Sequence, residues 1–457
     1  MTAKLRIGQI TDLHARHVIH GSSAAVNRRS RDVLGLLPLA IDQLKSHDVD
    51  FLVLTGDLVD VPDFILDPND YYHMDIETWL PLVRADYQAI KDILDESGLP
   101  YMVLPGNHDY ERVMWQVFDQ STNVVDVAQG YRVVRFCDRE WEGHVPRRFD
   151  RERKLWMEML ADVQSPPQVH LQHYVITPQI DHHYPHNYFE ADHILEKTSV
   201  SGNVRLSLSG HYHSGSELLR INESYFATGR AFCESPHPFR LYELSEHDVR
   251  MQEFTILDEP NIYCGRNVVF LDRDGVINNR ASYTTGPEDF ELIPGAAQAI
   301  LKLRQAGYAV VINTNQSCIG LGYVSQSTVV MTHERMCQLL VEETGDEDAQ
   351  PDLILFSVGA GEYAVHHSLA DTSVTKPSPA LLKQAEELLN LNPQGAWMVG
   401  DRATDLQAAL AYGATPILVR TGNGAGTEQT LGELGFDGVV VCDDLVGAVK
   451  HILLESS

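Results

Sequence analysis

The chain contains two successive series of short apolar runs, each run followed at once by polar residues. The first series comprises LRIGQIT, DFLVLTGD, YMVLPGN, QVHLQH and VRLSLSG. The second comprises NVVFLD, YAVVINT, DLILFS, AWMVGD, TPILVR and GVVVC, and it alternates with segments of helical periodicity. Such runs are typical of strands buried on both faces. Because open α/β sheets bind ligands beyond the carboxyl ends of their strands, we expect two α/β domains, each with a site at one sheet edge.

The boundary between these domains is expected near residues 258–265. There LDEPNIYCGR combines a proline and turn-forming residues with a loss of periodicity. We therefore divide the chain into domains 1–260 and 261–457. A chain of 457 residues gives each domain enough length to bury its own core without disulfides or a structural metal.

The net charge of −29 disfavours long nucleic acids and anionic membrane surfaces as partners, whereas small substrates held through metal ions remain compatible. The six cysteines are scattered without a CxxC pair, which argues against a disulfide framework. The first residues show no signal-peptide core, and no apolar run is long enough to span a membrane. We therefore expect a cytoplasmic protein.

Five fragments of the first half carry candidate metal ligands: DLH, GDLVD, GNHD, a lone histidine after QVHLQ, and GHYH. Each fragment follows a strand run. Together they supply Asp12, His14, Asp57, Asn107, His173, His211 and His213. This mixture of oxygen and imidazole donors suits Mn, Fe or Zn better than Ca. Residues two apart at an extended strand end point the same way, so Asp12 and His14 can share one ion.

The ordered set resembles the calcineurin-like metallophosphoesterases, and within them the class III cyclic-nucleotide phosphodiesterases, over residues 5–245. The resemblance implies a four-layer α/β sandwich with two divalent transition metals. It places Asp12, His14, Asp57 and His213 on one ion, and Asp57, Asn107, His173 and His211 on the other. Two such ions generate a hydroxide for attack at phosphorus, and His108 would protonate the leaving oxygen.

Three further features of the first half are less specific. Asp60 lies outside the ligand set, and we expect it to have a structural hydrogen-bonding role. The stretch DHHYPHNYFE carries His182, His183 and His186, and a substrate-facing loop is favoured over an extra metal site because no ligand spacing is met. The segment Asp63 to Trp79 either walls the substrate cleft or is an ordinary surface loop.

The second half carries four elements in order. Asp272 and Asp274 stand two apart in DRDGV, directly after NVVFL. The later elements are INTNQS with Thr314 and Asn315, TKPSP with Lys376, and VGDRATD with Asp401 and Asp405. Asp residues after strands often only cap helices, but capping does not explain the lysine and the threonine in this order.

These elements resemble the haloacid dehalogenase phosphatases across residues 266–455, in the capless branch that contains heptose-bisphosphate, histidinol-phosphate and polynucleotide 3′-phosphatases. The resemblance implies a Rossmann-like domain without a large cap. It makes Asp272 the nucleophile that forms an aspartyl-phosphate and Asp274 the general acid and base. Substrate would be bound by Thr314, Asn315 and Lys376. Mg²⁺ would be held by Asp272, the backbone carbonyl of Asp274, and Asp401, with Asp405 behind them.

The second half departs from the heptose-bisphosphate phosphatases in one loop. Those enzymes carry a Cys/His zinc loop before the lysine and an arginine beside it. The corresponding stretch FSVGAGEYAVHHSLADTSVTKPS has no cysteine, and Thr375 stands in place of the arginine. We therefore expect no zinc here, since the adjacent His366 and His367 do not make a metal site by themselves.

The sequence predicts a bifunctional, metal-dependent phosphoester hydrolase. The first site would be a binuclear phosphodiesterase or phosphatase, and the second a Mg²⁺-dependent phosphomonoesterase. The expected substrates are small phosphorylated metabolites, a sugar phosphate or a nucleotide. Two alternatives remain: nucleic-acid end repair by a cyclic phosphodiesterase with a 3′-phosphatase, and a protein with one inactive, regulatory domain. The oligomeric state is left open.

Overall fold

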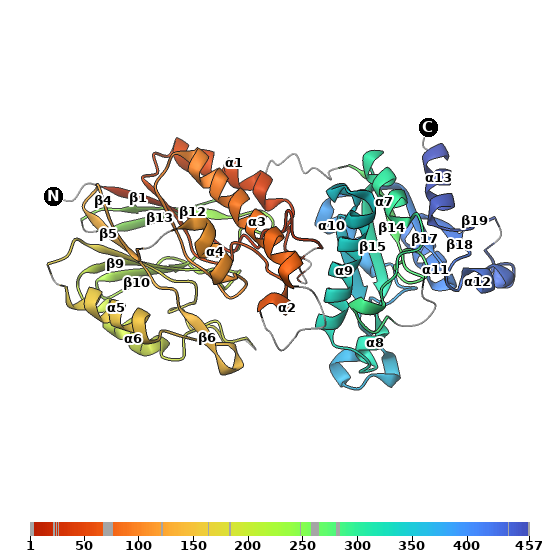
Figure 1. The fold of residues 1–457 in the computed structure, drawn as a ribbon. Coiled ribbons are helices and arrows are strands. Elements are labelled where there is room, and N and C mark those ends of the chain that lie inside the picture. Colours follow the sequence, from red (N-terminus) through yellow and green to blue (C-terminus); the bar gives the residue numbers. More distant parts are fainter. Residues whose placement is uncertain are drawn as a thin grey trace. The chain divides into compact units, whose positions relative to one another are not determined.

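The computed structural model describes residues 4–455, except 22, 24, 26, 67–75, 120–121, 163, 182–183, 247, 257–264, 280–283 and 437. The chain forms two compact units, one within residues 1–257 and one formed mainly by residues 258–457. The predicted boundary near 258–265 falls almost entirely outside the described residues and stays a prediction. The two units are taken separately below (Figure 1).

The first unit is built on two mixed β-sheets. One has the order β13-β12-β1-β2-β3, with bounds Val249–Phe254, Phe239–Leu244, Leu5–Ile10, Phe51–Leu54 and Tyr101–Val103. The other has the order β10-β11-β9-β8-β5-β4, with bounds Leu219–Ile221, Ser224–Thr228, Val204–Ser209, Gln168–Leu171, Tyr131–Arg135 and Val124–Val127. Apolar side chains of both sheets meet in one cluster, for example Ile7 and Val53 with Val133 and Leu206.

Helices cover the outer faces of these sheets (Figure 1). On the first sheet, Leu44 of α1 packs directly over Gly8 of β1. On the second, Trp156 and Ile194 pack against Phe136 and Phe226. The helices are α1 (Val33–Ser46), α2 (Asp63–Leu66), α3 (Ile76–Ser97), α4 (Glu111–Phe118), α5 (Asp150–Ala161) and α6 (Ala191–Ser199). A separate hairpin joins β6 (Arg139–Trp141) to β7 (Val145–Arg147). The predicted four-layer α/β sandwich is confirmed.

The second unit is a three-layer α/β fold around one parallel sheet (Figure 1). The strand order is β16-β15-β14-β17-β18-β19, with bounds Leu353–Ser357, Ala309–Asn315, Asn267–Leu271, Asn392–Gly400, Thr415–Val419 and Val440–Cys442. One face packs against α7 (Ala296–Gln305), α9 (Gln326–Thr344) and α13 (Leu445–Glu455). The other packs against α10 (Ala380–Leu389) and α11 (Ala403–Tyr412). Two short helices, α8 (Ser317–Gly320) and α12 (Gly424–Thr430), complete the unit.

The second unit has no large cap among its described residues. Between Asp272 and Asn313, apart from residues 280–283, the only helices are the 3-10 turn η3 (Pro287–Asp289) and α7. This confirms the predicted Rossmann-like domain with an open site. Across the described part of the chain, every helix is too short or too polar to cross a membrane.

Candidate functional sites

The first candidate site lies beyond the carboxyl ends of β1, β2, β3, β8 and β9. Potential ligand atoms gather there within 4.8 Å of one another in overlapping groups: Asp12, His14 and His213; His14, Asp57 and His108; and Asp57, His173 and His211. Asn107 joins the last group, since its Oδ1 lies 3.1 Å from His173 Nε2. The structure therefore brings all seven predicted ligands together, with Asp57 between two groups.

The backbone at this site is strained. Asp12, His14, Asp57 and His211 have φ values of 52°, 45°, 52° and 68°. The left-handed region costs a residue other than glycine about 1–3 kcal/mol, and such strain is concentrated at functional sites. The surrounding structure holds these four residues in this backbone conformation, so their polar side chains point into one small volume.

The donor atoms fit bound cations. His14 Nε2 lies 3.3 Å from His213 Nε2 and 3.5 Å from Asp57 Oδ2. Buried polar atoms normally find a hydrogen-bond partner, yet the buried Nε2 of His211 has none in the described structure. Facing imidazole nitrogens, a shared carboxylate and an unsatisfied nitrogen are what a pair of transition-metal ions requires.

Neighbouring groups orient the imidazoles. His173 Nδ1 lies 2.8 Å from the carbonyl oxygen of Thr55, so Nδ1 carries the proton and Nε2 faces the other ligands. His213 Nδ1 lies 2.5 Å from Glu234 Oε1. Nδ1 of His213 therefore also carries the proton, and its Nε2 faces His14. Carboxylate and carbonyl partners of this kind commonly orient metal-bound histidines. Sequence reasoning missed Glu234, because a single glutamate 21 residues beyond His213 belongs to no motif.

His108 lies beside the predicted ligands His14 and Asp57, and Asp60 holds its ring. His108 Nδ1 lies 3.0 Å from Asp60 Oδ1, and its side chain is 25% exposed. Asp60 is buried and also contacts Arg16 and Arg28 at 3.1 Å each, which matches the structural role predicted for it. Burial lowers the pKa of His108. The nearby Asp57 and Asp60 raise it by more than burial lowers it, so the pKa lies above its usual value.

The central carboxylate of this site is ionised. Burial raises the pKa of Asp57, but the nearby His173, His108 and His14 outweigh burial, and the pKa falls well below its usual range. Asp57 therefore offers a negative charge to whatever cation the surrounding groups hold.

The loop after β8 forms part of the wall of the first site. The rings of Tyr184 and His186 lie 5.4 and 5.1 Å from the ring of His211, and Tyr184 Oη donates to Glu140 Oε1 at 2.6 Å. This position agrees with the predicted substrate-facing loop, and no candidate metal group in the described chain includes His186. His182 and His183, and residues 67–75 of the segment Asp63 to Trp79, lie outside the described residues.

The second candidate site lies beyond the carboxyl ends of β14, β15 and β17. Lys376 Nζ is buried there and contacts Asp272 Oδ1 at 2.9 Å, Asp405 Oδ1 at 2.7 Å and the carbonyl oxygen of Asn313 at 2.7 Å. Carboxylate oxygens of Asp272, Asp401 and Asp405 lie within 4.8 Å of one another. The structure thus joins the predicted nucleophile, lysine and acidic pair.

The carboxylate cluster fits a hard cation. Asp401 Oδ2 accepts hydrogen bonds from the backbone and side-chain nitrogens of Asn423, at 2.7 and 3.0 Å. Its other oxygen, Oδ1, is buried without a hydrogen-bond partner in the described structure. A buried, unsatisfied carboxylate oxygen beside two further carboxylates matches the all-oxygen ligands of Mg²⁺.

Asp274 is held by residues that the sequence did not single out. Nη2 of Arg273 donates to both oxygens of Asp274, and Gln316 Nε2 donates to Oδ2 at 2.9 Å. Arg273 is itself fixed by His333, whose Nε2 lies 3.0 Å from Nη1. Burial raises the pKa of Asp274, but Arg273 and the hydrogen bonds lower it below the usual value.

The predicted substrate-binding residues lie at the end of β15. Thr314 is buried, and its Oγ1 accepts a hydrogen bond from Gln316 at 3.0 Å. Asn315 holds the lysine loop, because its Oδ1 accepts from the backbone nitrogen of Lys376 and its Nδ2 donates to that residue's carbonyl. A direct contact of Asn315 with substrate stays a prediction.

The charges of the second site depend on Lys376. Burial raises the pKa of Asp272 to about 6, although Lys376 acts against this rise. Burial lowers the pKa of Lys376, but Asp272 and Asp405 more than compensate, so the ammonium group stays charged.

The loop before Lys376 contains His366 and His367. His366 Nδ1 contacts Ser368, and no candidate metal group in the described chain includes either histidine.

Known proteins match both halves of the chain. A family model described as calcineurin-like phosphoesterase matches residues 5–215, and one described as HAD-hydrolase-like matches residues 373–448. The D-glycero-beta-D-manno-heptose-1,7-bisphosphate 7-phosphatase of Pseudomonas putida is 35% identical over 187 residues, covering 41% of this chain and 99% of that protein. The enzyme of that name from Pseudomonas aeruginosa is 34% identical over 189 residues, covering 41% and 98%.

Two solved structures are similar as well. The D,D-heptose 1,7-bisphosphate phosphatase from B. bronchiseptica, complexed with magnesium and phosphate, is 30% identical with a TM-score of 0.36 and covers 41% of this chain and 99% of that chain. A dimetal phosphatase from Danio rerio is 14% identical with a TM-score of 0.44, covering 56% and 97%.

Folds, site geometry and family matches together define a phosphoric ester hydrolase with two phosphoesterase units. The chain belongs to the calcineurin-like phosphoesterases through its first unit and to the HAD-like hydrolases through its second. Both families depend on divalent metals, in agreement with the donor sets described above.

Proposed function

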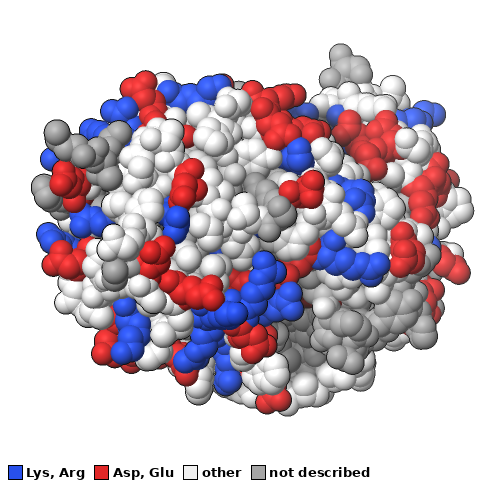
Figure 2. Space-filling view, turned by 60° about the vertical axis from the view of Figure 1, so that its left-hand side comes forward, with Lys and Arg blue, Asp and Glu red and all other residues white. Residues whose placement is uncertain are grey.

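We propose that the first site is a phosphodiesterase and the second a phosphomonoesterase, both acting on small phosphorylated metabolites. The observation that carries this proposal is a set of reactive side chains at each of two separate sheet edges. On the face shown in Figure 2, most of the described Lys and Arg side chains are interspersed with Asp and Glu, and one group of them gathers in the lower centre. The net charge of −29 favours small substrates over long nucleic acids.

At the first site, Asp57 is shared by two ligand sets. One also contains Asp12, His14 and His213, and the other Asn107, His173 and His211. Two transition-metal ions, when bound there, supply the hydroxide nucleophile and neutralise charge on the phosphoryl oxygens. His108 gives its proton to the leaving oxygen, and Asp60, 3.0 Å from its Nδ1, holds the ring for this step. Its partial exposure leaves this ring accessible to substrate.

At the second site, Asp272 attacks phosphorus and forms an aspartyl-phosphate. Lys376 neutralises the phosphoryl charge, Thr314 positions the group, and Asp274 moves the proton of the leaving group and of the incoming water. Mg²⁺, held by Asp272, Asp401 and the carbonyl of Asp274, supplies further charge stabilisation when bound.

Sugar phosphates are the first class of monoester to test. The named relatives act on a heptose bisphosphate. This chain has Thr375 beside the lysine and no cysteine in residues 353–376, so its substrate need not be a heptose bisphosphate. Nucleotides are the second class, because the uncapped site admits a bulky leaving group.

The test uses two substitutions in the full chain. Asp57→Asn should abolish hydrolysis of bis(4-nitrophenyl) phosphate and leave the Mg²⁺-dependent hydrolysis of phosphomonoesters by the second unit. Asp272→Asn removes the attacking oxygen at constant size. It should abolish the Mg²⁺-dependent hydrolysis of phosphomonoesters and leave the hydrolysis of bis(4-nitrophenyl) phosphate. Loss of both activities in a folded Asp57→Asn protein, or substantial Mg²⁺-dependent turnover by Asp272→Asn, would disprove the assignment.

A further inference from the structure

One arginine of the first unit reaches the edge of the predicted metal centre. Nη1 of Arg28 lies 3.1 Å from Asp60 Oδ1. The same oxygen lies 3.0 Å from His108 Nδ1 and 3.4 Å from Nδ1 of the predicted ligand His14. Arg28 precedes α1 and belongs to none of the five motif fragments. A guanidinium group, the proposed proton donor and a predicted metal ligand therefore meet at one oxygen atom.

Asp60 cannot neutralise Arg28 by itself. Nε of Arg16 lies 3.1 Å from Asp60 Oδ2 and donates to the carbonyl oxygen of Asp60 at 2.7 Å. Both arginine side chains are largely buried, with 4% of Arg16 and 15% of Arg28 exposed. The single negative charge of Asp60 therefore faces two guanidinium groups as well as the ring of His108. At this carboxylate, the positive groups outnumber the negative one.

The guanidinium group of Arg28 has unused hydrogen-bond donors. Among the described residues, Nη1 is its only nitrogen with a hydrogen-bond partner, and Nε is buried without one. Buried donors normally find a partner, and leaving one unsatisfied costs about 1–3 kcal/mol. Nε and Nη2 lie along one edge of the guanidinium plane. Such an edge can donate two parallel hydrogen bonds to the oxygens of one phosphoryl group.

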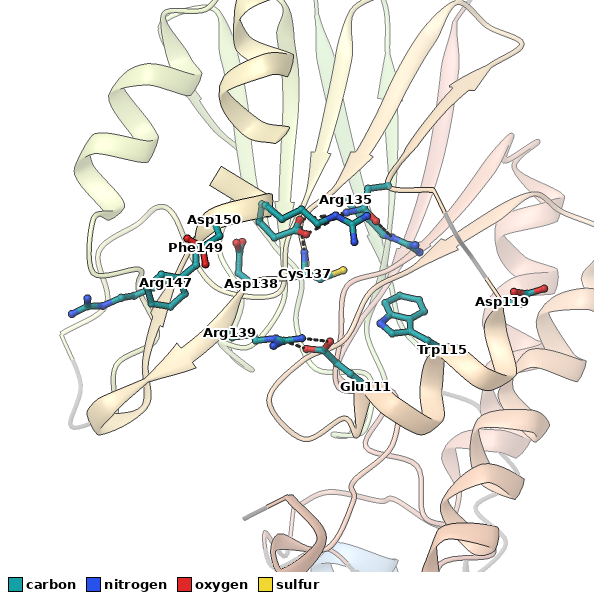
Figure 3. Close-up of a pocket in the computed structure, with 13 residues that line it drawn as sticks. Glu111, Trp115, Asp119, Arg135, Cys137, Asp138, Arg139, Arg147, Phe149 and Asp150 are labelled. Atoms are coloured by element: carbon teal, nitrogen blue, oxygen red, sulfur yellow. Dashed lines mark hydrogen bonds and ion pairs between the residues drawn. The ribbon is translucent and has the colours of Figure 1, made fainter. Parts of the chain in front are cut away.

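The arginines of the large cavity between α4 and α5 differ from Arg28 (Figure 3). That cavity has a volume of about 520 Å³, and five carboxylate side chains line it beside four arginines. Arg139 donates to Glu111 at 3.0 and 2.8 Å. Arg135 lies 4.5 Å from the centre of the Trp115 ring and donates to a backbone carbonyl oxygen at 2.9 Å. Carboxylates outnumber arginines there, in contrast to the surroundings of Asp60.

We propose that Arg28 is a substrate-binding residue of the first site and holds the phosphoryl oxygens of the reacting phosphodiester. This inference rests on the proposed phosphodiesterase function and adds a residue to that site. Asp60 anchors Nη1, and the edge formed by Nε and Nη2 donates to two phosphoryl oxygens. The positive charge of Arg28 stabilises the negative charge that these oxygens gain in the transition state.

The kinetics of bis(4-nitrophenyl) phosphate hydrolysis test this contact in the full-length Asp272→Asn protein, whose second site releases no phosphate. Adding Arg28→Gln should lower kcat/KM about 100-fold and raise the inhibition constant of inorganic phosphate about tenfold. The metal content by elemental analysis should stay that of the parent, because Arg28 is not a ligand. Arg28→Lys keeps a charge near Asp60 but loses the planar edge, and it should raise the inhibition constant about threefold.

Arg132→Gln is the matched control. The Arg132 side chain is 18% exposed, close to the 15% of Arg28, and it pairs with Asp126 and Asp162. Arg132 lies beside Gln168, the first residue of β8, whereas the site lies beyond the last residue of that strand. This variant should keep the kcat/KM and the inhibition constant of the parent.

The parent's inhibition constant in folded Arg28→Gln and Arg28→Lys proteins would overturn the assignment, and thermal unfolding shows which variants are folded. Loss of metal ions from Arg28→Gln would also overturn it, because Arg28 would then act through Asp60 and the metal centre. A parent that does not hydrolyse the diester rejects the proposed function. Calorimetric titration with inorganic phosphate in Mg²⁺-free buffer then tests Arg28 separately. Weaker phosphate binding by Arg28→Gln would support the contact with phosphoryl oxygens, and equal binding would reject it.

Discussion

The surroundings of His108 fit the role of proton donor that we propose for it at the first site. Its Nδ1 contacts Asp60, and its pKa is raised by Asp57 and Asp60 against the effect of burial. We predict that His108→Asn lowers kcat/KM by about 100-fold or more for a diester with an alkyl leaving group, such as glycerophosphoglycerol. Bis(4-nitrophenyl) phosphate should be much less affected, because 4-nitrophenolate leaves without a proton. An equal loss with both substrates would contradict the acid role.

Gly275 sets the position of a predicted Mg²⁺ ligand. It has a φ of +87°, and an added Cβ would lie 2.4 Å from Asp401 Oδ2. Gly275→Ala should therefore displace Asp401 and weaken activation by Mg²⁺ about 10- to 100-fold, measured as the Mg²⁺ dependence of 4-nitrophenyl phosphate hydrolysis.

Gly307→Ala is the matched control for that change. Gly307 has a φ of +89°, but an added Cβ meets no atom within 4 Å. Both substitutions carry the same backbone strain, so the control should keep the Mg²⁺ dependence of the parent. An equal change in Mg²⁺ dependence in the two variants would show that backbone strain, and not displacement of Asp401, causes the change.

Motif residues were predictable at this scale, whereas the residues that orient them were not. The seven predicted ligands of the first site follow strands in a specific order, and the structure brings them together. Glu234, Arg273 and His333 follow no spacing rule, because their contacts depend on how distant segments pack. Their roles become visible only once the sheets are assembled.

At the scale of elements, a buried ion pair anchors the segment that enters α5. Arg148 lies between β7 and α5, donates to Asp138 three times at 2.8–3.1 Å, and stacks 3.9 Å above the Phe136 ring of the second sheet. Arg148→Met leaves the Asp138 carboxylate buried without its guanidinium. The free energy of unfolding of the first unit should fall by about 3–5 kcal/mol.

Scanning calorimetry of the full chain measures this loss. At about 2–4 °C per kcal/mol, the transition of the first unit should move down by roughly 6–20 °C, while that of the second unit stays in place. Arg153→Met is the control, because Arg153 and Glu190 form an exposed pair worth about 1 kcal/mol or less. A shift no larger than that of the control would contradict the anchoring role.

Most of the parallel strands were predictable from sequence, whereas the parallel strands β5 and β11 and most of the antiparallel strands were not. Every apolar run named at the outset forms a strand, from β1 to β19. Strands such as β4 and β13 lie at sheet edges, and their mixed burial gives them no continuous apolar run. A strand covered on one side only carries a weaker sequence signal than one buried on both faces.

At the scale of the whole molecule, the two donor sets predict different metal contents. The first site is rich in imidazole and the second is carboxylate only. The purified full chain should contain close to two Mn, Fe or Zn ions per molecule by elemental analysis. Asp57→Asn should lose them, and Asp272→Asn should keep them. Zinc that remains stoichiometric in Asp57→Asn would contradict the prediction that the second unit has no zinc loop.

The order of the two chemistries suggests why both occur in one chain. Cutting a diester yields a monoester, and an aspartate nucleophile removes phosphate from a monoester. The product of the first site is therefore a possible substrate of the second, since the described residues around Asp272 include no large cap. Two unrelated phosphatases sharing regulation are the competing explanation.

The ratio of products from a single diester tests the central claim most directly. Wild-type protein given bis(4-nitrophenyl) phosphate should release two nitrophenolates for each inorganic phosphate. Asp272→Asn should release one nitrophenolate, produce no phosphate and accumulate 4-nitrophenyl phosphate, whereas Asp57→Asn should leave the diester intact. Inorganic phosphate released by Asp272→Asn at the wild-type rate, or diester hydrolysis by Asp57→Asn, would contradict two sites with divided roles.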